Sequence, residues 1–151
     1  MSADFAIRAD QGLTFEDGPD RGRVLVFGHQ TGGRYSLMEW TVASGAVPLL
    51  GYGAHSHGEI EETFLVRSGS LEFLLGEKIT TLNTGDFVRV PAGARHGYAN
   101  TSGAPVELLV SFYPGGFEEL FVKYRTDGGD PAGGEGFIAE ASRLHASKFE
   151  S

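Results

Sequence analysis

The chain of 151 residues contains no cysteine. Disulfides, zinc–thiolate sites and cysteine nucleophiles are therefore excluded. The sequence also lacks any run of the roughly 20 apolar residues that a membrane-spanning helix needs, so we expect no membrane partner. Its first ten residues, MSADFAIRAD, carry acids and no apolar stretch. A secretory signal has a different pattern, and the expected compartment is the cytoplasm.

Positive charge is scarce as well. Twelve Lys and Arg residues stand against 20 Asp and Glu, which gives a formal net charge of -8. This charge repels phosphate backbones, so nucleic acid is not an expected partner. Apolar residues make up 40% and charged residues 21% of the chain, as in soluble globular proteins. The length fits one well-buried core and is too short for two ordinary domains.

Glycine, in contrast, is abundant. The 23 glycines suggest many tight turns, as in a fold of short strands. Turn signals recur every 8 to 12 residues between Arg23 and Tyr113, a spacing typical of all-β domains. The predicted strands are 23–28, 35–42, 62–69, 71–75, 86–90, 96–101 and 106–113.

The pattern changes after Pro114. Residues 115–125 could form a strand or a short helix, because their apolar spacing does not decide between them. Residues 127–136 have the composition of a flexible linker. Residues 137–150 are predicted to form a helix that docks by a face carrying Ile138 and Leu144, and that covers either the main unit or a partner subunit. The predicted organisation is an N-terminal segment over 1–22, an all-β unit over 23–125, and a linker with a final helix over 126–151.

Three of the five histidines lie where they could share a site. His55 and His57 are separated by one residue, so both point to the same face of an extended strand. His96 lies on another predicted strand, just after the turn PAGAR. Two or three imidazoles with one carboxylate are a common ligand set for a divalent transition metal, and Fe, Mn, Ni and Zn all suit it.

Two motifs identify a family. The stretch GDFVRVPAGARHGYAN (85–100) resembles the second motif of the cupin superfamily, and HSHGEIEETFLVRSG (55–69) resembles the first. The matching residues are Gly85, Pro91, Gly93, His96 and Asn100 in the second motif, and His55, His57, Glu62 and Gly69 in the first. One departure is Leu49, which stands where the first motif begins with glycine. The resemblance covers roughly residues 23 to 113. It implies an all-β fold, a single cupin double-stranded β-helix (jelly-roll barrel) with a short C-terminal helical extension.

The motif spacing admits either Glu61 or Glu62 as the carboxylate ligand. Counting by two from Glu62 reaches Phe64 and Val66, an apolar and therefore inward face. Counting from Glu61 reaches Arg67, which is better placed in solvent. We therefore predict that His55, His57, Glu62 and His96 bind one metal.

A small barrel that is open at one end uses part of its core to line a ligand cavity. We predict that Met38, Phe64, Tyr98 and Phe112 contact the substrate. Tyr98 lies two residues beyond His96, so it is expected on the same face. The other aromatic residues, Trp40 among them, are first of all expected in the core.

The ligand set is similar to that of cupin dioxygenases, including quercetinases. The resemblance implies a metal-dependent oxidoreductase, a dioxygenase that acts with dioxygen on an aromatic or enol-containing small molecule. In quercetinase-like cupins the residue that corresponds to Glu62 is assigned the role of catalytic base. Two alternatives stay open: a non-redox isomerase, cyclase or lyase, and a non-catalytic cupin that binds a small molecule. The resemblance also implies a homodimer, and Phe5 and Ile7 alternate as an exchanged edge strand would.

Overall fold

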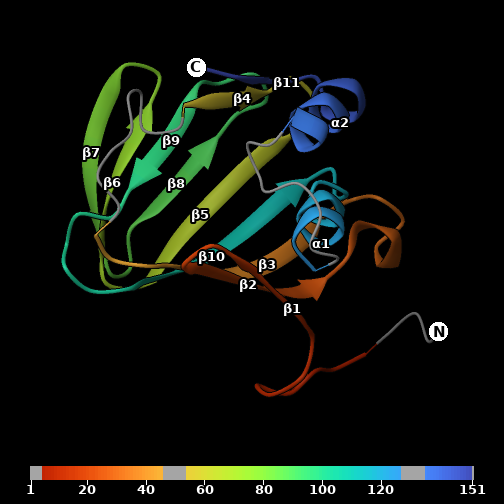
Figure 1. Cartoon of the computed structure of the whole chain (residues 1–151), viewed down its shortest axis with the longest axis horizontal. Coiled ribbons are helices and arrows are strands. Elements are labelled where there is room, and N and C mark those ends of the chain that lie inside the picture. Colours follow the sequence, from red (N-terminus) through yellow and green to blue (C-terminus); the bar gives the residue numbers. More distant parts are fainter. Residues whose placement is uncertain (1–4, 46–53, 127–134, 151) are drawn as a thin grey trace.

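The structure is a computed structural model that describes residues 5–45, 54–126 and 135–150. Two antiparallel sheets form the body of the molecule, and both helices lie on one side of it (Figure 1). The first sheet has the order β1-β2-β3-β10-β5-β8, with β1 Leu13–Asp17, β2 Asp20–Val26, β3 Ser36–Val42, β10 Val106–Tyr113, β5 Glu61–Ser68 and β8 Phe87–Val90. The second has the order β11-β4-β9-β6-β7, with β11 Ser147–Phe149, β4 His55–His57, β9 His96–Ala99, β6 Ser70–Leu75 and β7 Lys78–Asn83. The predicted all-β fold is confirmed.

Alternation of buried and less buried positions along the strands builds the core between the sheets. Strand β5 buries Glu62, Phe64 and Val66, while Arg67 is exposed, which confirms the inward face read from the sequence. Strand β3 buries Met38 and Trp40 in the same way. A carboxylate thus shares a row with apolar side chains, where it must be paired or bound to be tolerated.

Strands β1 and β7 were not predicted. The first sheet begins with β1, ahead of residue 23, and β1 pairs with β2 from Leu13↔Val24 to Asp17↔Asp20. Strand β7 pairs with β6 over its whole length although Leu82 is its one buried residue. A strand so exposed on both faces shows little hydrophobic alternation, so only its pairing partner reveals it.

The C-terminal region differs from the prediction in two ways. Residues 118–126 form a helix, α1 (Glu118–Thr126), which decides the alternative left open by the sequence. The second helix, α2 (Glu135–His145), ends earlier than predicted, and the chain continues as strand β11. The predicted docking face is also wrong in part, because Leu144 is 45% exposed whereas Phe137 and Ala141 are buried. The predicted linker at 127–136 lies mostly outside the described residues.

An aromatic cluster connects the helices to the barrel. Phe117 and Phe121 contact each other at 5.5 Å between ring centroids, and both contact Phe137 of α2. Burial of such large side chains dominates the energetics of helix docking. None of the helices within the described ranges is long and apolar enough to cross a membrane.

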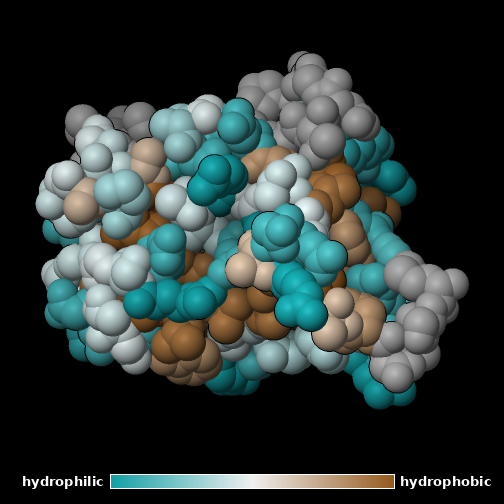
Figure 2. Space-filling view, turned by 90° about the horizontal axis from the view of Figure 1, so that it is seen from below, coloured by the Kyte–Doolittle hydropathy of each residue, from teal (hydrophilic) through white to brown (hydrophobic). Residues whose placement is uncertain are grey.

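Figure 2 views the molecule from the side of β1, β2, β3 and β10, and apolar side chains gather there among polar ones. The N-terminal residues Phe5 and Ile7 are 44% and 36% exposed. They belong to no strand of this chain. The predicted homodimer and the exchanged N-terminal strand therefore remain predictions.

Candidate metal centre

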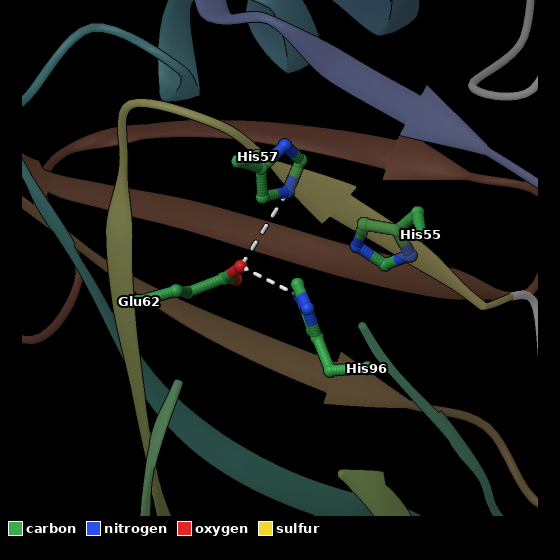
Figure 3. A group of neighbouring side chains, drawn as sticks. All are labelled: His55, His57, Glu62 and His96. Atoms are coloured by element: carbon green, nitrogen blue, oxygen red, sulfur yellow. Dashed lines mark hydrogen bonds and ion pairs between the residues drawn. The ribbon is translucent and has the colours of Figure 1, made fainter. Parts of the chain in front are cut away.

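Four side chains from three strands point into one space between the sheets (Figure 3). His55 and His57 come from β4, Glu62 from β5 and His96 from β9. One potential ligand atom from each residue lies within 4.8 Å of those of the other three. His57, Glu62 and His96 are only 2%, 6% and 1% exposed, and His55 is half-buried. The structure thus brings together all four residues predicted as ligands.

The turn before β9 fixes His96. Its Nδ1 lies 3.0 Å from the carbonyl oxygen of Ala94, which can only accept a hydrogen bond, so Nδ1 carries the proton and donates. The Nε2 atom then faces Glu62, 3.1 Å from Oε1. Gly93 adopts φ +83°, a conformation that glycine adopts without strain, and its N–H donates to the carbonyl of His57 at 2.8 Å. The turn therefore links the two histidine-bearing strands.

The second motif ends with a residue that has a structural role. Asn100 is fully buried, and its Nδ2 donates to the carbonyl oxygens of Val42 at 3.1 Å and Ala104 at 2.8 Å. Its Oδ1 accepts from the backbone N–H of Ser102. These bonds connect the end of β9 to β3 of the opposite sheet, so Asn100 holds the barrel closed around the site.

The pKa values of three residues in the cluster are shifted, and the two histidines shift in opposite directions. Burial lowers the pKa of His57 to about 3, despite the nearby Glu62 carboxylate. Burial acts on His96 in the same direction, but the hydrogen bond and the charge of Glu62 prevail and raise its pKa. For Glu62, burial favours the neutral acid, yet the hydrogen bond and the charge of His96 outweigh it and lower the pKa of the carboxyl. Glu62 is thus an anion, and His57 is a neutral imidazole that can offer a lone pair without losing a proton.

The donor set fits a divalent transition metal. Ligand atoms at roughly 2.0–2.2 Å from one ion lie at most about 4.4 Å apart, so the observed spread of 4.8 Å needs an adjustment of only a few tenths of an ångström. The distances from Glu62 Oε1 to Nε2 of His96 and of His57, 3.1 and 3.6 Å, suit neighbouring positions in a coordination shell. Imidazole with carboxylate accepts several divalent ions, so these residues do not select one metal.

A cavity of about 520 Å³ opens onto the cluster. That volume lies within the roughly 300–1,000 Å³ common for small-molecule sites. The predicted substrate-contacting residues Met38, Phe64, Tyr98 and Phe112 all line it. The remaining lining residues are Asp17, Asp20, Trp40, Ala54, His55, His57, Glu62, Val110, Phe117, Phe121, Phe137, Ile138, Phe149 and Glu150.

Sequence reasoning missed the C-terminal part of this lining. Ile138 reaches the cavity from α2, Phe149 from β11 and Glu150 from the position after β11, so the C-terminal segment covers the pocket. Trp40, expected in the core, also borders the cavity, and its buried indole N–H makes no hydrogen bond of normal geometry. The alternation in β3 could have identified Trp40, because it shares the inward face of Met38.

Comparisons with known proteins agree with this architecture. Residues 38–112 match the cupin domain family. Quercetin 2,3-dioxygenase of Bacillus subtilis (strain 168) is 30% identical over 95 residues, which are 62% of this chain and 27% of the length of that enzyme. Among solved structures, KdgF from Halomonas sp. has a TM-score of 0.62 at 17% identity, covering 78% of this chain and 99% of that one. The polyketide cyclase RemF from Streptomyces resistomycificus has a TM-score of 0.59 at 20% identity, with 73% and 79% covered. At such low sequence identity, the likeness of this chain to KdgF and RemF shows a common fold and nothing about function. The chain belongs to the cupin superfamily.

Proposed function

We propose that this cupin is a metal-dependent oxidoreductase, a dioxygenase that acts on a neutral aromatic or enol-containing small molecule. The observation that carries the proposal is the character of the cavity beside the four ligands. Most of its described lining is aromatic or aliphatic, with Phe64, Phe112 and Phe117 close to the cluster. Flat aromatic molecules bury well against such rings.

The charge of the cavity narrows the substrate class. Among the described residues that line it there are four acids, Glu62 included, and no lysine or arginine. The stretches 46–53 and 127–134 contain no lysine or arginine either. Apart from the metal ion itself, a carboxylate or phosphate on the substrate would have no cationic partner among these residues, and it would face like charges. Neutral hydroxylated molecules fit this cavity better than sugar phosphates or small dicarboxylates.

Each residue of the site has a definable part. His55, His57, Glu62 and His96 would hold the ion. A divalent ion held there supplies a Lewis acid that favours the anion of a substrate hydroxyl. Glu62 is the one carboxylate among the four candidate ligands and would accept the proton of that hydroxyl. Burial raises the pKa of Tyr98, so its phenol stays protonated and can donate a hydrogen bond to a substrate oxygen. The phenylalanines exclude water from the reacting atoms.

The relative in Bacillus subtilis supports a dioxygenase in particular. The 95 aligned residues are 62% of this chain, although they are a small part of that enzyme. The likeness to a polyketide cyclase concerns the fold, and the same aromatic cavity would also suit a cyclase substrate. Oxygen dependence separates the two reactions.

The test measures turnover with and without dioxygen. The protein is loaded separately with Fe(II), Mn(II), Ni(II) or Zn(II) and offered flavonols and other hydroxylated aromatics, each paired with a carboxylated or phosphorylated analogue. We expect oxygen uptake equal to product formed for at least one neutral compound, and none for the charged analogue. Equal turnover under anaerobic conditions would overturn the dioxygenase and indicate an isomerase, cyclase or lyase. Tight binding without turnover would indicate a binding protein.

A further inference from the structure

The C-terminal strand lies directly beside the strand that carries two of the candidate ligands. Strand β11 pairs with β4 in the register Ser147↔His57 and Phe149↔His55. Backbone hydrogen bonds at both ends, Gly58 N–H to Ala146 O at 3.1 Å and Glu150 N–H to Ala54 O at 3.0 Å, hold the pair together. The last residues of the chain therefore form the edge of the metal-bearing sheet.

One side chain of β11 contacts a ligand ring. The Oγ atom of Ser147 lies 2.6 Å from Nδ1 of His57, and Ser147 is only 3% exposed. The other ring nitrogen, Nε2, faces Glu62 Oε1 at 3.6 Å and is the atom available to a metal. A ligating Nε2 needs its lone pair, so Nδ1 must carry the proton and donate it to a hydrogen bond. The Ser147 oxygen is placed to accept that bond.

The rest of the segment keeps this oxygen in place. The ring of Phe149 stacks on His55 at 5.7 Å between centroids with an interplanar angle of 18°. Ser142 of α2 donates from Oγ to the carbonyl oxygen of Ser147 at 3.0 Å. A Cβ on Gly58 would lie 2.9 Å from the Cβ of Ala146, so the close approach of the two strands depends on that glycine.

We propose that Ser147 is a positioning residue for His57. Strand β11 would then support one of the metal ligands directly. The inference rests on the proposed metal site. Ser147 fixes the tautomer and the orientation of the His57 ring, as the second partner of a metal-bound histidine does. The other buried histidine of the cluster, His96, obtains the same support from a backbone carbonyl. His57 takes it from a strand that is distant in sequence, so docking of the C-terminus and metal affinity are coupled.

The experiment compares Ser147→Thr with Ser147→Val, two variants of nearly equal volume that differ in the hydroxyl. Dissociation constants for Zn(II) and Co(II) are measured by chelator competition, and the Co(II) absorption spectrum reports the coordination shell. We expect the Val variant to bind about 10- to 100-fold more weakly than the Thr variant, with an altered Co(II) spectrum. Lys148→Ala is the matched control, because Lys148 follows Ser147 in β11 but its side chain is exposed on the opposite face of the strand. Its affinity and its spectrum should equal those of the wild type.

A second measurement decides the question if the Ser147 variants do not fold. Nitrogen and proton NMR of the zinc-loaded wild type should show His57 with zinc on Nε2 and a slowly exchanging proton on Nδ1. Zinc on Nδ1, or an Nδ1 proton that exchanges freely with water, would overturn the proposal. Equal affinity of the Thr and Val variants would overturn it too. Wild-type protein that binds no metal would instead remove the proposed function on which the inference rests.

Discussion

Replacing Glu62 by glutamine separates metal binding from proton transfer. Glutamine keeps the shape of the side chain and one carbonyl oxygen, so the three imidazoles still converge on the site. It removes the negative charge that Oε1 now presents to the Nε2 atoms of His96 at 3.1 Å and of His57 at 3.6 Å. An amide is also far too weak a base to accept a proton from a hydroxyl group.

The expected loss follows from the role of the base. A positioned general base contributes roughly 100- to 10,000-fold to a rate. This corresponds to about 3 to 5 kcal/mol of transition-state stabilisation. We therefore expect Glu62→Gln to retain appreciable metal while kcat, measured at saturating metal with the best substrate of the panel, falls within that range.

Two neighbouring acids provide the controls. Glu61 points away from the cluster and pairs with Arg89 at 2.7 Å, and Glu59 is exposed. Glu61→Gln and Glu59→Gln should keep the wild-type kcat and metal content. If a Glu62→Gln variant binds metal and remains as active as the wild type, Glu62 is not the base, and another group must accept the proton.

Three further predictions concern stability and assembly. Ala146 adopts φ 50°, a conformation that costs an alanine about 1 kcal/mol. Ala146→Gly should therefore raise the free energy of unfolding, measured in urea, by about 1 kcal/mol. A decrease would show that this backbone conformation is not strained. Burial lowers the pKa of His145 below 6.5, so the unfolded chain takes up a proton first as the pH falls. The stability of the wild type relative to His145→Phe should therefore decrease below pH 6.5, and a constant difference would exclude this effect. If the protein is the proposed homodimer, sedimentation should give twice the chain mass of 16.1 kDa. The double substitution Phe5→Ser and Ile7→Ser should weaken the dimer. A wild-type protein that is monomeric at every concentration would exclude the homodimer.

Much of the fold and the ligand cluster could be predicted because their patterns are local. In β5 the alternation of the buried Phe64 and Val66 with less buried residues places Glu62 inside and Glu61 outside. The spacing of His55 and His57 puts both rings on one side of a strand. These inferences need only the period of two and the separation of the motifs.

The remaining features depend on contacts between distant segments. Residues 147–149 continue an apparent helical pattern, yet they form a strand because the edge of β4 offers them backbone partners. Leu144 fits a helical apolar face by spacing, but Phe137 and Ala141 occupy the space against Phe117 and its neighbours. The contact between Ser147 and His57 joins residues that are 90 positions apart, and no local signal indicates it.

The metal content of the purified protein shows whether the four candidate ligands bind an ion. After reconstitution with Fe, Mn, Ni or Zn and removal of excess ion, elemental analysis of the wild type should give close to one equivalent of metal per chain. His96→Ala removes an Nε2 donor that lies 3.1 Å from Glu62 Oε1, so that variant should lose most of the metal while remaining folded. Wild-type protein that stays metal-free with all four ions, or an H96A variant that binds as much metal as the wild type, would contradict the account.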